Sequence, residues 1–275
     1  MVSMGKSKLK RAILWSSVLV VGIALSLGAI RSAGRGGSTR TLHLARKEDR
    51  LSSLPHVILW AWERPEKLDF IDQSKVGVAF LAKTLYLRGD QVVTRPRLQP
   101  LAIHNGTAVI AVARIESDRA ETPTLSRVQI EAAATEISAL AHLPDVVAVQ
   151  IDFDATTSER VFYSALLFKV RETLPPAVGL SITALASWGK GDNWLGQLPV
   201  DEAVPMLFRM GVDRAQIVGS LAAGEEFRAS PCQQSQGVST DEPLPHLPAR
   251  QRVYVFNPKP WSRIAVKTVL EKYRQ

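Results

Sequence analysis

Short apolar runs alternate with longer amphipathic segments from Leu54 to the C-terminus, and this alternation constrains the fold more than any other feature. Several of the short runs are almost entirely apolar, as expected for parallel strands that are covered by helices. We predict eight strands, the seventh being the weakest, over residues 57–62, 76–81, 108–114, 146–152, 180–185, 203–209, 237–241 and 252–257.

Three amphipathic segments have the periodicity of helices and are predicted over residues 126–143, 158–174 and 261–273. Thr156 and Glu159 have the spacing of a capping box before the second of them. Residues 85–99 are predicted to form a hairpin excursion that turns at Gly89-Asp90. Eight strands with interleaved helices in roughly 220 residues predict an α/β fold with a (β/α)₈ TIM-type barrel over residues 54–275.

A doubly wound sheet is the main alternative to a barrel, because it also alternates strands and helices. That fold usually has a glycine-rich phosphate loop directly after its first strand. Here the first predicted strand continues into Trp62-Glu63-Arg64-Pro65, which contains no glycine. The sequence therefore favours the barrel and predicts no nucleotide site.

The N-terminus has the layout of an export signal. A basic segment, residues 1–12, precedes an uncharged hydrophobic run over residues 13–30, which we predict to be one N-terminal helix. Small residues near its end permit signal cleavage, but the run is longer than a usual signal core, so we favour an uncleaved anchor. Residues 31–53 are predicted to be a flexible linker. We expect the protein to span the inner membrane once and to place its folded domain in the periplasm or outside the cell. If the leader is cleaved, we expect the domain to be secreted.

The formal net charge of +8 belongs mainly to this leader. Residues 1–40 contain seven of the 34 basic residues and none of the 26 acidic ones, so the remainder is almost neutral. No basic stripe is left to neutralise phosphates, and nucleic acid is not an expected partner. The single cysteine, Cys232, is interpreted as a structural or surface thiol, because no histidine lies near it in the sequence.

The fourth predicted strand contains the most informative residues. Because side chains alternate along a strand, Val147, Val149, Ile151 and Phe153 would share an apolar face toward the helices. Ala148, Gln150, Asp152 and Asp154 would face the barrel lumen, with the two aspartates at the catalytic C-terminal end. Paired carboxylates there should raise one pKa into a useful range for acid–base chemistry. The alternative interpretation is that each aspartate caps a helix or orders a loop.

Other predicted strand ends contribute polar and aromatic groups of the kinds that stack on sugar rings or bind their hydroxyls. The candidate acids are Glu63, Glu116 and Glu242. The candidate binding residues, besides Gln150, are Trp60, Trp62, Arg114, Thr183, Trp188, Arg209, Asp241, Asn257 and Trp261. Trp60 and Trp188 could instead be core residues, and the two arginines could simply neutralise the acids. The scattered histidines predict no metal site, and we expect no cofactor.

Six segments in order resemble a bacterial family of unknown function that is usually placed among the glycosidase-like TIM barrels. They are ILWAWERPE, VGVAFLA, VQIDFDA, LSITALASW, PMLFRMG and VFNPKPW. The resemblance implies a barrel, an exported or membrane-anchored location and a carbohydrate ligand. A more distant likeness is to chitinase-type barrels, whose fourth strand ends in D-x-D-x-E. Asp152 and Asp154 match the aspartates, but Thr156 stands where the acidic glutamate should be.

The leading hypothesis is therefore an envelope-facing, glycosidase-like barrel that binds a glycan and hydrolyses it with strand-end carboxylates. Because Thr156 replaces the expected acid, one of the three candidate glutamates would have to supply the proton. The second hypothesis is a non-catalytic glycan-binding or envelope assembly protein with the same barrel. A weaker third is a scaffold that contacts another membrane protein.

Overall fold

The computed structural model describes residues 50–191, 194–244, 248–250 and 252–273. The predicted basic segment, the hydrophobic helix of residues 13–30 and most of the predicted linker lie outside these residues. Within the described part of the chain, no helix has the length and apolar character needed to span a bilayer.

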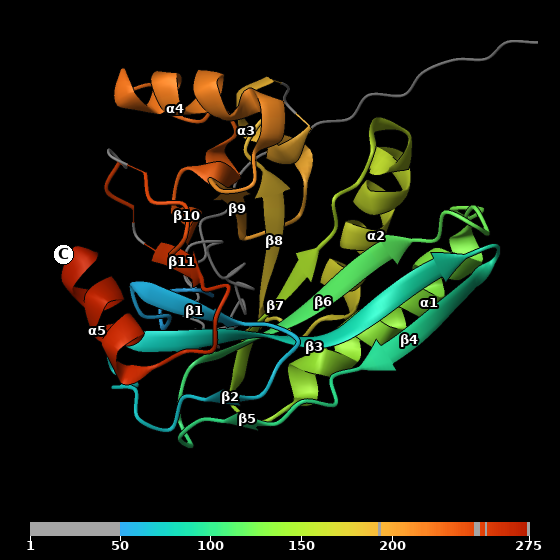
Figure 1. Cartoon of the computed structure of the whole chain (residues 1–275). Helices are drawn as coiled ribbons and strands as arrows, with labels where there is room; N and C mark the ends of the chain where they lie inside the picture. The colour runs from blue at the N-terminus through green and yellow to red at the C-terminus, as the bar shows by residue number, and fades with distance from the viewer. Residues whose placement is uncertain (1–49, 192–193, 245–247, 251, 274–275) are drawn as a thin grey trace, which may run out of the picture. The chain divides into compact units, whose positions relative to one another are not determined.

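Eight parallel strands form a closed barrel, which confirms the predicted α/β class and is consistent with a TIM-type architecture (Figure 1). The strands follow one another around the ring in chain order, and the last pairs with the first, Val57 lying opposite Val253. They are β1 Val57–Ala61, β3 Val76–Arg88, β6 Val109–Ser117, β7 Val146–Asp152, β8 Gly179–Leu185, β9 Glu202–Met206, β10 Ser235–Ser239 and β11 Arg252–Phe256. Each overlaps one predicted strand.

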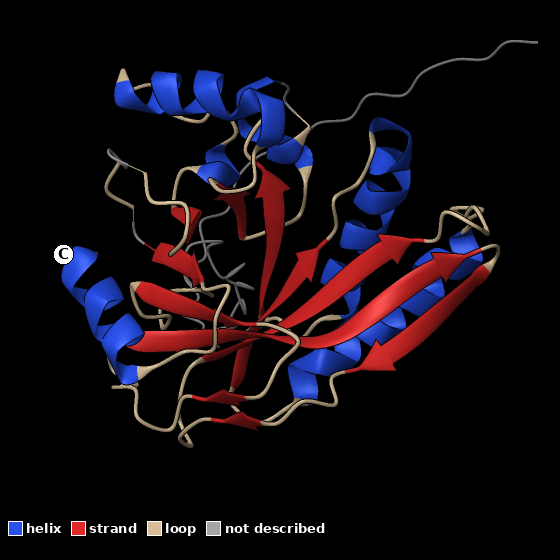
Figure 2. Ribbon diagram, viewed as in Figure 1, coloured by secondary structure: helices blue, strands red, loops and turns tan. Residues whose placement is uncertain are grey.

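The helices cover the barrel unevenly (Figure 2). The predicted segments contain α1 Arg127–Ser138, continued by a 3₁₀ turn at Ala139–His142, then α2 Arg160–Thr173 and α5 Arg263–Lys272. The structure adds α3 Trp188–Gly191 and α4 Arg214–Ala222. Among the described residues, no α-helix connects β1 to β3 or β3 to β6. A two-stranded sheet of β2 Glu66–Lys67 and β5 Leu101–Ala102 lies in these connections instead.

Local signals in the sequence explain several element boundaries. The backbone N–H of Thr156 donates to the Glu159 carboxylate at 2.7 Å, which confirms the predicted capping box. The long strand β3 returns antiparallel as β4 Gln91–Pro96, and the predicted turn at Gly89-Asp90 connects them. Gly89 has a φ of +52°, a left-handed conformation that glycine adopts without strain.

The core has an outer part under the helices and an inner part that fills the lumen. Val149, Ile151 and Phe153 belong to the outer part, as predicted for one face of β7. Val147 differs from that prediction, because it packs against the lumen cluster near a register shift between β6 and β7. Leu51, which the sequence placed in the linker, is buried in the lumen cluster together with Leu54.

The packing inside the barrel requires a glycine on β10. A Cβ atom on Gly237 would lie 2.9 Å from the Trp60 ring and 3.4 Å from Val204. We therefore expect Gly237→Ala to displace Trp60 and to lower the free energy of unfolding by about 1–3 kcal/mol, the usual range for overpacking.

Chemical denaturation of the wild type and of Gly237→Ala would measure this effect. Gly219→Ala is the matched control, because a Cβ at Gly219 on α4 meets no atom within 4 Å and alanine favours a helix. Equal stability of the wild type and Gly237→Ala would contradict the expected displacement of Trp60.

Candidate functional site

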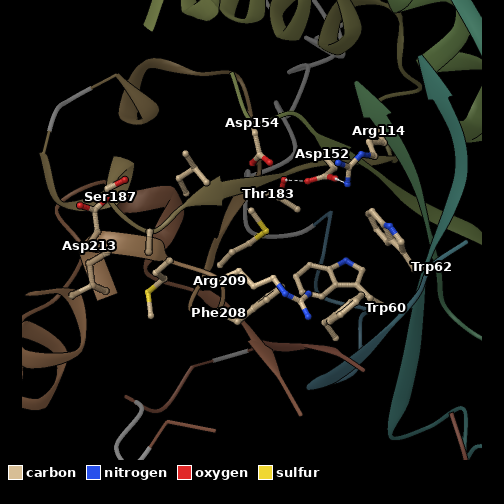
Figure 3. A pocket seen from close by; sticks show the side chains of 16 residues that line it. Trp60, Trp62, Arg114, Asp152, Asp154, Thr183, Ser187, Phe208, Arg209 and Asp213 are labelled. Carbon is tan, nitrogen blue, oxygen red and sulfur yellow. Dashed lines mark hydrogen bonds and ion pairs between the residues drawn. The ribbon is translucent and has the colours of Figure 1, made fainter. Parts of the chain in front are cut away.

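A pocket of about 300 Å³ opens at the carboxyl ends of the barrel strands, the end where barrels of this architecture place their active sites (Figure 3). We call it the mouth pocket. Its walls come from the ends of β1, β6, β7, β8, β9 and β11 and from the segment before and within α4. Its lining includes Trp60, Trp62, Arg114, Asp152, Asp154, Thr183, Met206, Phe208, Arg209, Met210, Asp213 and Phe256.

Asp152 is fixed in place at the wall of the mouth pocket. Its side chain is 10% exposed, and it accepts a hydrogen bond from Thr183 Oγ1 at 2.7 Å. Arg114 Nη1 lies 3.3 Å from its other oxygen. Burial raises the pKa of Asp152 above its ordinary value, although the hydrogen bond from Thr183 and the charge of Arg114 oppose this shift. The carboxyl group is therefore held in one orientation, and Thr183 and Arg114 both act to stabilise its carboxylate form.

Asp154 lies two residues further along the chain and is exposed at the mouth pocket (Figure 3). Its carboxylate has no hydrogen-bond partner among the described residues. The pocket walls partly dehydrate it and raise its pKa, while the charge of Arg114 acts in the opposite direction. A carboxyl group with a raised pKa and no protein partner is free to exchange a proton with a ligand.

Arg114 connects these acids to the aromatic wall. Its Nε donates to Glu116 at 2.7 Å, and its guanidinium lies 5.8 Å from the centre of the Trp62 ring. Burial acts to lower the pKa of Arg114, but the negative charges of Asp152 and Glu116 raise it overall. Arg114 therefore remains a cation beside the two aspartates.

Aromatic rings form the floor of the mouth pocket. Phe208 and Phe256 are stacked, with centroids 5.7 Å apart and an interplanar angle of 4°. The Arg209 guanidinium lies 5.1 Å from the Phe256 centroid. Trp60, which is 3% exposed, also lines the pocket, and its ring centroid lies 6.1 Å from that of Phe208 and 5.3 Å from that of Tyr254. Flat apolar faces of this kind suit the CH surface of a pyranose ring.

Arg209 has an unusual backbone conformation, with a φ of +51°. This left-handed region is disfavoured for residues with a side chain, and such residues concentrate at functional sites. The backbone N–H of Arg209 donates to Glu242 at 3.0 Å, and its guanidinium lies 3.5 Å from Asp241. Glu242 and Asp241 therefore hold Arg209 over the aromatic floor and do not line the mouth pocket themselves.

A buried polar chain below the floor fixes the orientation of Trp60. Trp60 Nε1 donates to Gln150 at 2.9 Å, Gln150 donates to Ser181 at 3.0 Å, and Ser181 donates to Glu202 at 3.2 Å. Glu202 also accepts hydrogen bonds from Tyr254 and Arg252. Gln150 thus faces the lumen as predicted, but it lies below the mouth pocket and supports its floor.

The other predicted acids are occupied elsewhere. Glu63 forms an ion pair with Arg95 outside the mouth pocket, and Glu116 pairs with Arg114 at its edge. Glu242 pairs with Arg214 at 3.0 Å. None of the three lines the mouth pocket, so the structure leaves Asp152 and Asp154 as the acids near its centre, together with Asp213 on the opposite wall.

Three predicted binding residues also lie away from the mouth pocket. Trp188 is buried in the outer core, where it packs edge-on against Trp194. Trp261 is buried near α5 and donates from Nε1 to the Trp60 carbonyl oxygen at 2.9 Å. Asn257 accepts a hydrogen bond from Thr240 at 2.7 Å. Trp188 and Trp261 therefore contribute to core packing, and Asn257 helps to order a loop. For Trp188, a core position is the alternative interpretation given by the sequence.

Several lining residues were not predicted from the sequence. Met206, Phe208 and Phe256 follow the alternation of their strands, and that alternation could have identified them. Met210 and Asp213 come from the segment before α4, a helix for which no clear sequence signal was recognised.

No family model, no curated protein and no solved structure matches this chain in the three comparisons made.

Proposed function

We propose that this protein is an envelope-facing, glycosidase-like barrel that binds a glycan in the mouth pocket and hydrolyses it. Export by the hydrophobic segment of residues 13–30, and membership of the glycosidase-like bacterial family noted above, are parts of the same proposal. The main support for this proposal is the position of Asp154. Its carboxyl group has no hydrogen-bond partner among the described residues, and it lies beside the oriented Asp152 in a pocket with an aromatic floor.

The proposed reaction adds water across a glycosidic bond. Asp154, in its protonated form, donates its proton to the oxygen that leaves as the carbon–oxygen bond breaks. The carboxylate form of Asp152 stabilises the positive charge that develops on the sugar ring. A water molecule then adds to the anomeric carbon and returns one proton to Asp154, which restores the acid for the next reaction.

The aromatic floor and the two arginines support binding. Phe208, Phe256 and Trp62 offer faces for the sugar ring, while Arg114 and Arg209 can donate hydrogen bonds to its hydroxyl groups. This combination favours a polar ligand with an apolar face over a purely apolar one.

A second candidate function is glycan binding without cleavage. It is favoured by the ion pairs that occupy Glu63, Glu116 and Glu242, because no glutamate in the described part of the chain lines the mouth pocket. In this case Asp154 would accept hydrogen bonds from sugar hydroxyl groups and would transfer no proton.

A glycan array probed with the purified protein, followed by product analysis of every glycan that binds, tests the proposal. We expect binding to a limited set of glycans and the release of shorter products from them. Binding without any product would favour the second candidate, and the absence of binding across the array would contradict both.

A further inference from the structure

A second cavity, of about 540 Å³, adjoins the mouth pocket on the side of the loops that follow β6 and β7. We call it the side cavity. Three residues, Arg114, Asp152 and Asp154, line both cavities. The two cavities therefore meet at Asp154 and Asp152, to which the proposed reaction assigns proton transfer and charge stabilisation, and at the neighbouring Arg114.

The lining of the side cavity differs chemically from the aromatic mouth pocket. It includes four hydroxyl-bearing residues and several charged ones: Ser117, Thr122, Thr156, Ser158, Glu116, Asp118, Arg119 and Glu159. Such a surface can exchange hydrogen bonds with a polar ligand, and Phe153, the aromatic residue in its lining, is largely buried.

Internal contacts already occupy much of this polar surface. Ser117 and Thr156 both donate to Glu159, and Asp118 pairs with Arg88 at 2.9 Å. The side chains of Arg119 and Thr122 have no partner among the described residues, and both are exposed. These two groups therefore remain available to a ligand that enters from the Asp154 side.

We propose that the ligand is a chain of at least two sugar units that spans both cavities, and this inference rests on the proposed function. One unit lies on the aromatic floor, the next lies against Arg119 and Thr122, and the linking oxygen lies beside Asp154. At about 300 Å³, the mouth pocket is at the small end of ligand sites and accommodates one unit better than a chain. The substrate class is thus an oligosaccharide, not a single sugar.

The position of Asp154 gives the physical reason for this arrangement. A general acid must lie within hydrogen-bond reach of the bond that breaks. Because Asp154 lies where the two cavities meet, that bond must join a unit in one cavity to a unit in the other. A ligand confined to the mouth pocket would leave Arg119, Thr122 and the rest of the side cavity to water.

The test compares single sugars with chains of the same sugar, using the full chain in equilibrium binding measurements. The probes are glucose and N-acetylglucosamine with their β-1,4-linked oligomers of two to six units, together with any monosaccharide and oligomer pair that the glycan array identifies. We expect an oligomer to bind at least about ten-fold more tightly than its own monosaccharide, which corresponds to about 1.4 kcal/mol.

Arg119→Ala combined with Thr122→Ala removes the two exposed side chains that the side cavity offers to a ligand, and neither residue lines the mouth pocket. This double variant should reduce oligomer affinity toward that of the monosaccharide while monosaccharide affinity stays the same. Lys267→Ala combined with Thr268→Ala is the matched control, because both residues are exposed on α5 and line neither cavity, and it should change neither affinity.

Equal affinities for monosaccharide and oligomer, or an unchanged preference for the oligomer in the Arg119→Ala, Thr122→Ala variant, would overturn the inference while leaving the proposed function intact. Failure of every probe to bind would instead reject the proposed function itself.

Discussion

Replacing Asp154 with asparagine should lower the kcat of glycan hydrolysis by at least about 100-fold, the contribution typical of a general acid. The amide cannot donate an acidic proton to the leaving oxygen. Asparagine has nearly the same size, and Asp154 makes no hydrogen bond to the described protein that the substitution would break. Glycan affinity and the free energy of unfolding should therefore change little.

The measurement is kcat, KM and direct glycan binding for the wild type and the variant, on a glycan that the array identifies. Asp152→Asn should also abolish turnover, because the neutral amide no longer stabilises a developing positive charge, and it can still accept the hydrogen bond from Thr183. Unchanged turnover in either variant would exclude the assigned role. If Glu63→Gln showed the large fall instead, the proton donor would be Glu63 and the assignment to Asp154 would be wrong.

The pH profile provides an independent check on the same acid. Asp154 must be protonated to act as a donor, and dehydration by the pocket walls raises its pKa above the ordinary value of 3.8. The decline of kcat/KM on the alkaline side should therefore follow a pKa above 3.8, and this decline should be absent from the residual activity of Asp154→Asn.

Replacing Arg252 with methionine should lower the free energy of unfolding by about 3–5 kcal/mol, the cost of leaving a buried charge without its partner. Arg252 and Glu202 are 2% and 0% exposed, and Arg252 Nε lies 3.1 Å from the Glu202 carboxylate. Methionine fills much of the same volume but provides no charge. The loss therefore comes from the stranded carboxylate and not from a large cavity.

Chemical denaturation of three variants tests whether the unpaired Glu202 carboxylate causes the loss of stability. Adding Glu202→Gln to Arg252→Met should recover most of the stability, because the amide is neutral and can still accept hydrogen bonds from Tyr254 and Ser181. Arg88→Met is the control, since Arg88 pairs with Asp118 on an exposed strand end, and it should have little effect. A small loss of stability in Arg252→Met, or no recovery of stability in the double variant, would show that the Arg252–Glu202 ion pair does not stabilise the barrel interior in this way.

The sequence by itself determined the ring of strands. Each of the eight predicted strands appears in the barrel, and several of them are short, almost entirely apolar runs, as expected for parallel strands covered by helices. Period-two alternation also placed Gln150 and Asp152 toward the lumen, and the capping-box spacing of Thr156 and Glu159 located the turn that begins the second predicted helix. These signals are local, so they can be recognised within a few residues.

Only the tertiary structure decided which strand-end residues meet. Glu63, Glu242, Trp188 and Trp261 follow strands just as Asp154 does, yet ion pairs or core packing hold them away from the mouth pocket. Asp213 reaches it from the segment before α4. A side chain's final position depends on partners far away in the chain, whose contacts no local pattern encodes. The composition of the mouth pocket therefore depends on closure of the barrel, on the ion pairs of Arg95 with Glu63 and of Arg214 with Glu242, and on the core packing of the two tryptophans.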